Sequence, residues 1–193
     1  SEVDSLSVAL FYKDMDKPIE RVVQAASGTA GNSRTFQNSE SAELYGLEVD
    51  GRFEFALGEG YDRTVFVSFN AAFIESEVTA QSQEDRALQG QPEYTANLIL
   101  GYDDIGAGHQ LTVLLNQNGK SIADVGVSGQ PDVFLEPRLD LNVVYRFNIS
   151  DALTLKAKLE NLLDDEVEYT QGGQIFQVYN RGPSVQIGLD WQF

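Results

Sequence analysis

Three segments of the sequence contain residue types that occur in catalytic or metal sites. Gly126–Gly129 is similar to a nucleophile elbow, but Gln130 stands where that turn needs glycine. The single histidine, His109, lies in a glycine-rich turn, and we interpret it as a solvated turn residue. Asp14 and Asp16 begin like a calcium loop, but the later ligands are missing. We therefore predict no catalytic, metal or cofactor site and do not expect an enzyme.

Another group of residues has the chemistry of ligand binding. Aromatic and amide side chains alternate in one long segment, and stacking together with hydrogen bonding suits a sugar or another flat polar ligand. Membrane-interface anchoring and simple loop packing explain the same residues equally well. Arg21 and Arg34 in one earlier segment and Arg86 in another could meet an anionic ligand, although most such arginines are only solvated. The candidate binding residues are Tyr169, Gln174, Phe176, Tyr179, Arg86 and Arg34.

Composition excludes several classes of protein. The chain has 193 residues, a formal net charge of -17 and no cysteine. An acidic chain lacks the basic surface that nucleic acid requires, and without cysteine there are no disulfides or thiolate metal sites. No run of about 18 apolar residues predicts a transmembrane helix. Membrane strands must be tested separately, because their hydrophobicity lies in every second residue.

The last ten residues show most clearly that β-strands would position the candidate binding residues. Apolar and polar residues alternate strictly from Ser184 to Phe193, which predicts a strand with one apolar face and one polar face. The same alternation recurs in seven further segments, and none has a convincing helical period. The eight predicted strands lie near residues 6–12, 45–55, 65–73, 94–102, 111–117, 138–147, 153–160 and 184–193.

Three features favour a membrane barrel over a soluble β-sandwich, which also has alternating strands. Several runs reach about ten residues, the length that a tilted membrane strand needs. Aromatic residues gather toward strand ends, and the links between strands alternate long and short, as in outer-membrane barrels. We predict an all-β, antiparallel transmembrane β-barrel. A soluble sandwich that binds carbohydrate is the alternative.

Charged residues on the polar faces allow two interpretations. They would either form cross-strand ion pairs on a solvated inner wall or line a charged path for a substrate. The first interpretation is the one we predict. The residues are Glu48, Asp50, Arg52, Glu54, Arg138, Asp140, Arg146, Lys156, Lys158 and Glu160.

Several motifs, in a fixed order, resemble those of TonB-dependent receptors. The closing segment of that family is similar to Glu160–Asp164 followed by Tyr169, Gly172–Gly173 and Arg181–Ser184. Recurrent strand starts of the family are similar to Ser41–Glu48, Gln91–Leu98 and Leu139–Leu141. The resemblance spans nearly the whole chain.

This resemblance implies a multi-pass receptor in the outer membrane of a Gram-negative bacterium. Family members have an N-terminal plug, a TonB-contacting segment and a barrel of about 22 strands. Residues 1–193 would be the C-terminal part of such a barrel, without the plug and earlier strands. Trp191 and Phe193 resemble the terminal signal for barrel assembly.

The implied function is TonB-coupled uptake of a scarce nutrient: siderophore-bound iron, cobalamin or carbohydrate. The implied partners are outer-membrane lipid, the plug, the remaining barrel strands, the TonB complex and the small-molecule nutrient. The alternative is a self-contained eight-stranded barrel with a structural or adhesive role, whose first strand would pair with its last.

Overall fold

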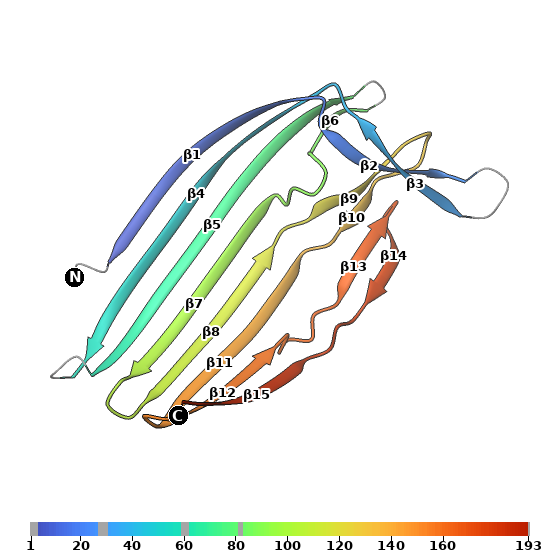
Figure 1. The fold of residues 1–193 in the computed structure, drawn as a ribbon. Helices are drawn as coiled ribbons and strands as arrows, with labels where there is room; N and C mark the ends of the chain where they lie inside the picture. The colour runs from blue at the N-terminus through green and yellow to red at the C-terminus, as the bar shows by residue number, and fades with distance from the viewer. Residues whose placement is uncertain (1–3, 27–30, 59–61, 81–82, 193) are drawn as a thin grey trace.

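The fold consists of β-strands joined by turns and links. The computed structural model describes residues 4–26, 31–58, 62–80 and 83–192, without the side chains of residues 83–85. These residues form 15 strands. None of them lies in a helix that could cross a lipid bilayer. Figure 1 shows one large curved sheet with a smaller sheet at its upper end.

Eight strands form the wall, and each is antiparallel to its neighbours. This number agrees with the sequence prediction. In order across the sheet they are β1 (Ser5–Asp16), β4 (Ser41–Leu57), β5 (Arg63–Ala80), β7 (Tyr94–Asp104), β8 (His109–Asn118), β11 (Arg138–Ser150), β12 (Leu153–Glu160) and β15 (Ser184–Trp191). A short strand, β6 (Gln83–Arg86), also pairs with β5.

The register places the predicted apolar residues on a single face of the wall. Residues paired across antiparallel strands share a face, and one apolar row crosses seven strands: Phe53, Val67, Leu100, Val113, Val143, Leu159 and Val185. The next row, on the other face, is Glu54, Phe66, Gly101, Thr112, Val144, Lys158 and Gln186.

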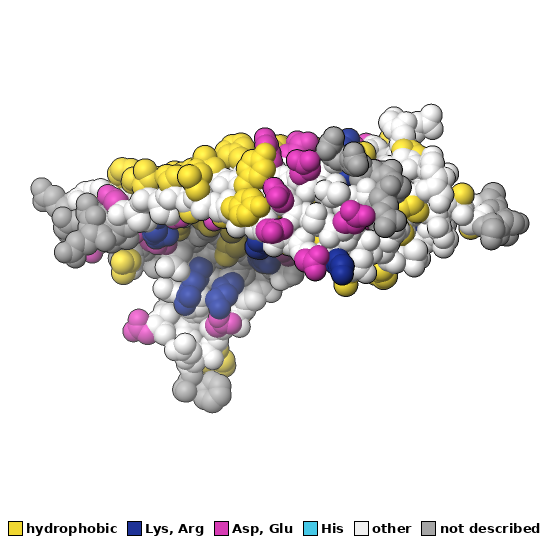
Figure 2. All heavy atoms as spheres, turned by 90° about the horizontal axis from the view of Figure 1, so that it is seen from above, with side chains coloured by type: hydrophobic (Ala, Val, Ile, Leu, Met, Phe, Trp, Pro, Cys, Tyr) yellow, Lys and Arg dark blue, Asp and Glu magenta, His cyan; other side chains and the backbone are white. Residues whose placement is uncertain are grey.

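The apolar face is convex and uncovered. In Figure 2 hydrophobic side chains gather along the convex side, whereas Lys and Arg side chains lie within the concave angle of the sheet. Leu10 on β1 and Ile187 on β15 are 82% and 74% exposed. A soluble sandwich would bury this face against a second sheet, so the sandwich alternative does not describe the fold.

The wall is an open, barrel-like sheet. In the part of the chain that the structure describes, β1 pairs only with β4, and β15 pairs only with β12. The closed eight-stranded alternative requires β1 to pair with β15, and that pairing is not formed. The arrangement is that of part of a larger barrel.

The long links were predicted as loops, and this prediction was wrong for much of their length. They contribute a second, six-stranded sheet at one end of the wall, in the order β14-β13-β10-β9-β2-β3. These strands are β2 (Ile19–Ala25), β3 (Asn32–Asn38), β9 (Ser121–Gly126), β10 (Val133–Leu135), β13 (Val167–Gln171) and β14 (Gln174–Tyr179). The predicted short links at the opposite end are confirmed, since only residues 58–62, 105–108 and 151–152 join wall strands there.

The alternation of side chains shifts by one residue where β8 gives way to β9. Gly119 N donates to Tyr94 O, and the adjacent Lys120 O accepts from Glu93 N. In a regular antiparallel strand, adjacent residues hydrogen-bond to opposite neighbouring strands. Gly119 and Lys120 both bond to the same neighbour, so from this point the face on which each side chain lies is shifted by one residue. Lys120 and Ile122 therefore lie on one face of the chain and Ser121 on the other, and Phe134, which pairs with Ile122, shares the face of Ile122 and packs against it in the core of the smaller sheet.

The inner wall carries ion pairs, but they do not follow the predicted cross-strand pattern. Arg52–Glu54, Arg138–Asp140 and Lys158–Glu160 pair within one strand at 3.5, 3.4 and 2.7 Å, and among the described residues of the inner wall only Lys156–Asp190 joins two strands. The register explains the difference, because neutral residues lie opposite these cations; Arg52, for example, faces Ser5 and Ser68.

His109 is not the solvated turn residue that the sequence predicted. It begins β8, and its ring stacks on Phe147 with the centroids 4.4 Å apart. Its Nδ1 lies 2.8 Å from the Tyr145 hydroxyl. Since His109 pairs with Phe147 on the apolar face, it belongs to an aromatic group at the short-link end of the wall.

Candidate functional site

The smaller sheet curls on itself and has its own buried core. One edge strand, β3, approaches the far side of the sheet, since Asn32 on β3 donates to Gln171 on β13, the neighbour of the other edge strand, at 3.4 Å. Valine side chains at positions 22, 23, 125 and 133 are almost fully buried. β-Branched residues favour strands, and the burial of these valines stabilises the smaller sheet. The curl brings residues of the first, third and last long links together.

A buried carboxylate organises the inside of this curl. Asp124 on β9 is 1% exposed; Arg21 Nε contacts its Oδ1, and Arg34 Nε lies 2.8 Å from its Oδ2. Both arginine side chains are about half exposed. Arg34 also lies over the ring of Phe176, 5.8 Å from its centroid, a cation–π geometry. Two guanidinium groups on one carboxylate leave an excess of positive charge at this surface.

Two tyrosines lie beside this carboxylate. Tyr169 and Tyr179 stack with their ring centroids 6.4 Å apart. Burial and the neighbouring Tyr179 hydroxyl raise the pKa of Tyr169 above its ordinary value. Tyr169 therefore remains a neutral hydrogen-bond donor at neutral pH. We call Arg21, Arg34, Asp124, Tyr169, Phe176 and Tyr179 the arginine–aromatic cluster.

A hollow of about 360 Å³ continues from the tyrosine pair down the inner face of the wall. Asn118 and Arg138 line it from the wall, and Arg181 lines it from the link before β15. The size lies within the usual range of ligand sites, about 300–1,000 Å³. Aromatic faces, phenol donors and guanidinium groups in one place can bind a planar, negatively charged ligand through stacking and charge-assisted hydrogen bonds.

A second buried ion pair attaches the β2–β3 hairpin to the wall. Glu20 on β2 is 2% exposed, and its carboxylate accepts from Arg86 Nη1 and Nη2 at 2.7 and 2.5 Å. Ser39 Oγ donates to the same carboxylate. Burial alone would raise the pKa of Glu20, but the hydrogen bonds from Arg86 and Ser39 and the charge of Arg86 hold it below its ordinary value.

This ion pair predicts a loss of stability in acid. Because the folded-state pKa of Glu20 is lowered, its contribution is complete above the unfolded-state value of about 4.3 and is lost as the pH falls through the folded-state value. Thermal unfolding of the full-length receptor between about pH 7 and pH 3 would measure this. A Glu20→Gln variant should lose less stability over that range than the wild type. Parallel curves for the two proteins would contradict the prediction.

The structure brings four of the six predicted binding residues together. Arg34, Tyr169, Phe176 and Tyr179 all belong to the arginine–aromatic cluster. Gln174 lies at the start of β14, exposed and paired through its backbone with Gln171. Arg86 lies apart from the cluster, in the ion pair with Glu20. A role of these residues in binding remains a prediction.

Of the two residues predicted to signal barrel assembly, Trp191 ends β15 and is 73% exposed. It lies on the apolar face, opposite Leu153. Phe193 lies outside the described residues. Their role in assembly also remains a prediction.

Sequence reasoning missed Asp124. A single carboxylate between Ile122 and Val125 in a short apolar segment was the available signal, because a charge so placed needs a partner. Within the described residues, no three Asp, Glu or His side chains are placed to hold a metal ion.

Comparison with known proteins connects this geometry to a family. Residues 2–162 match the family model described as "TonB dependent receptor-like, beta-barrel". The chain belongs to the TonB-dependent receptor family. This family resides in the outer membrane of Gram-negative bacteria, so the predicted localisation is confirmed, and in such a barrel the uncovered apolar face is the one expected to face lipid. By the usual arrangement of such barrels, the short links are periplasmic and the smaller sheet is extracellular.

Individual relatives agree with this assignment. The iron-regulated outer membrane virulence protein of Vibrio cholerae is 27% identical over 97% of the chain. The siderophore receptor PirA from Acinetobacter baumannii superposes with a TM-score of 0.66 at 18% identity over the whole chain. A mutant of the ferric enterobactin receptor PfeA from Pseudomonas aeruginosa superposes with a TM-score of 0.56 at 17% identity over 95% of the chain. The chain spans only 28–30% of the length of these proteins.

Proposed function

We propose that this chain supplies part of the barrel and extracellular surface of a receptor that takes up iron bound to an organic chelator. The arginine–aromatic cluster carries this proposal. Its two half-exposed guanidinium groups share a single buried carboxylate beside aromatic rings, which suits an anionic ligand with flat groups. The excess of positive charge at the cluster favours binding of an anionic iron chelate over binding of an uncharged sugar. The names of the similar proteins, an iron-regulated outer membrane protein, a siderophore receptor and a ferric enterobactin receptor, point the same way.

The remaining parts of the receptor belong to the same proposal. The chain's share of its relatives' length supports a partial barrel, and we assign it to the C-terminal part, with a plug domain and further strands supplied by the rest of the protein. Energy for uptake would come from the TonB complex acting on that plug. The chain's own contribution is to bind the ligand and to form the wall of the passage, with no covalent step.

Uptake of radioactive iron by cells expressing the full-length receptor tests this proposal. A panel of iron chelates, beginning with ferric enterobactin, would be supplied to a strain without other receptors for them. We expect Arg34→Gln and Tyr179→Ala each to weaken binding about tenfold, because each removes one contact of the cluster while the wall remains intact. Deletion of tonB should abolish uptake and leave binding in place.

The matched control is Arg63→Gln, which changes an exposed arginine at the periplasmic end of β5. This variant should bind and transport like the wild type. Unchanged affinity in both cluster variants, or no transport of any chelate in the panel, would contradict the proposal.

A further inference from the structure

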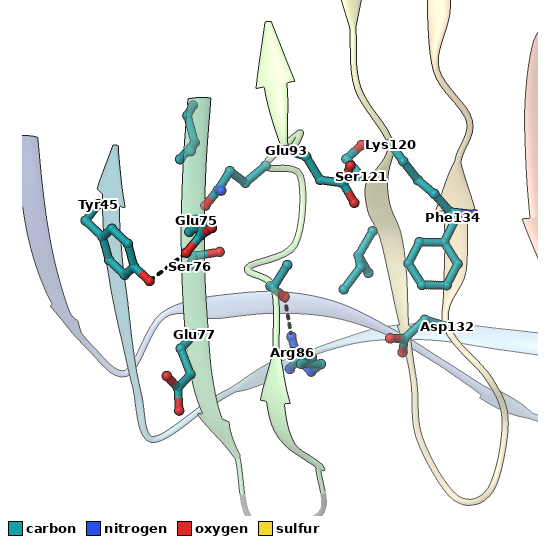
Figure 3. Close-up of a pocket in the computed structure, with 14 residues that line it drawn as sticks. Tyr45, Glu75, Ser76, Glu77, Arg86, Glu93, Lys120, Ser121, Asp132 and Phe134 are labelled. Carbon is teal, nitrogen blue, oxygen red and sulfur yellow. Dashed lines mark hydrogen bonds between the residues drawn. The ribbon is translucent and has the colours of Figure 1, made fainter. Parts of the chain in front are cut away.

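We propose that Gln89 is a positioning residue for the arginine–aromatic cluster, whose side-chain amide holds Arg21 where its guanidinium group can bind the anionic ligand. The inference rests on the proposed function of the cluster, and Gln89 acts through Arg21 without touching the ligand. Gln89 lies in the link of residues 87–93, which joins β6 to β7. Figure 3 shows this link between β5 and β9, with Arg86 and Glu93 near its two ends.

The backbone of this link is attached to its neighbours without the Gln89 side chain. Leu88 N donates to Ser76 Oγ on β5 at 2.8 Å. Gly90 N donates to Ile122 O on β9, also at 2.8 Å. These bonds hold the backbone of Gln89 beside β9 and its parallel neighbour β2. Because they do not involve the Gln89 side chain, we expect the link to stay in place when that side chain is shortened.

The side-chain amide of Gln89 forms hydrogen bonds to both β2 and β9. Its Oε1 accepts from Arg21 N at 2.6 Å, and its Nε2 donates to Arg21 O at 2.7 Å. The same Nε2 donates to Ala123 O on β9 at 2.8 Å. A carboxamide has one acceptor oxygen and two N–H donors, so the oxygen and both donors are used. For Arg21, the amide therefore takes the place of a backbone partner on a neighbouring strand.

The amide lies at the point where the backbone ladder between β2 and β9 begins. The first parallel pair of the two strands joins Val22 to Val125. Arg21 and Asp124 come one residue earlier on their strands, and their side chains form an ion pair of the cluster. Gln89 therefore connects the two strands next to this ion pair, where the backbone pairing does not reach, and fixes the spacing of the two charged residues.

A fixed backbone at Arg21 orients its guanidinium group. Arg21 Nε contacts Asp124 Oδ1, and Arg21 Nη2 donates to Ala123 O at 3.0 Å. The Gln89 amide donates to the same carbonyl oxygen. These contacts occupy the Nε side of the guanidinium, and the side chain remains 46% exposed, which leaves the Nη1 side for a ligand. A guanidinium held in advance can bind two oxygens of an anionic chelate with a smaller loss of side-chain entropy.

Equilibrium binding of radioactive ferric chelates to the purified full-length receptor in detergent tests this inference, with ferric enterobactin as the first probe. We expect Gln89→Ala to weaken binding about tenfold, because the guanidinium of Arg21 is still present but no longer held in position. Gln91→Ala is the matched control. It shortens a second glutamine of the same link, whose Oε1 accepts no hydrogen bond, and it should bind like the wild type.

A double-mutant cycle distinguishes the positioning of Arg21 from a general loosening of the link. Arg21→Gln should also weaken binding, and adding Gln89→Ala to it should cause no further loss, because Gln89 acts through Arg21. Additive losses, or unchanged binding by Gln89→Ala or by Arg21→Gln alone, would overturn the inference and leave the proposed function in place. A wild-type receptor that binds no chelate of the panel would overturn both.

Discussion

Replacing Arg86 by alanine should destabilise the extracellular sheet by about 3–5 kcal/mol, the usual cost of leaving a buried charge without its partner. Glu20 is 2% exposed, and Arg86 supplies two of its hydrogen bonds. The variant must either keep an unpaired carboxylate or take up a proton and release the hairpin. Guanidinium unfolding of the full-length receptor, monitored by hydrogen exchange in β2, would measure the change.

Two comparisons separate this ion pair from a general effect of mutation. The double variant Glu20→Met/Arg86→Leu should recover most of the lost stability, because apolar residues can replace a buried pair. Lys158→Ala removes an exposed partner of Glu160 on the inner wall and should cause no measurable change. If Arg86→Ala proved as mild as Lys158→Ala, the ion pair would not hold the hairpin to the wall.

The substitution Leu141→Arg should cost about 2–4 kcal/mol of barrel stability, because it places a cation on the lipid face near mid-membrane. Leu141 pairs with Leu115, which pairs in turn with Leu98, so the position lies within the apolar band. Denaturant titration of the receptor in lipid vesicles provides the measurement. The control is Leu114→Arg on the inner face, which should cost much less; its depth is nearly the same, because Leu114 pairs with Asn142, the residue next to Leu141. Equal costs at the two positions would contradict the assignment of faces.

The wall strands could be predicted from the sequence because every second residue of a membrane barrel strand faces lipid and is therefore apolar. Val185, Ile187 and Leu189 repeat with period two for the same reason that Val143 and Tyr145 do, since each lies on the outward face, which in a membrane barrel meets hydrocarbon. This signal is local. It needs no knowledge of which strand lies beside which.

The extracellular strands carry no such signal. They lie beyond the membrane, where both faces of a strand can be polar or apolar, as in β3 (Asn32–Asn38) and β14 (Gln174–Tyr179). Their burial depends on the curl of the sheet, and that curl depends on contacts between distant links. The segments were therefore predicted as loops.

The residue types of the candidate site could be predicted from the sequence, but the contacts that each residue makes could not. Arg34, Tyr169, Phe176 and Tyr179 were identified from their chemistry, and the fold brings them together. Arg86 has the same chemistry, but its partner Glu20 is 66 positions away in the sequence. Periodicity within one segment cannot identify a contact between two links, so the structural position of Arg86 was not foreseen.

Spin labels at Val143 and Val144 test most directly the claim that lipid covers the convex face. These adjacent valines have the same side chain but lie on opposite faces of the wall. Val143 pairs with the apolar residues Val113 and Leu159, whereas Val144 pairs with the polar residues Thr112 and Lys158. Single-cysteine variants of the full-length receptor, with any other cysteines removed, would be labelled in lipid vesicles. Collisions with oxygen should dominate at Val143, and collisions with a water-soluble nickel chelate should be relatively more frequent at Val144. Equal values at both positions, or the reverse order, would contradict the account.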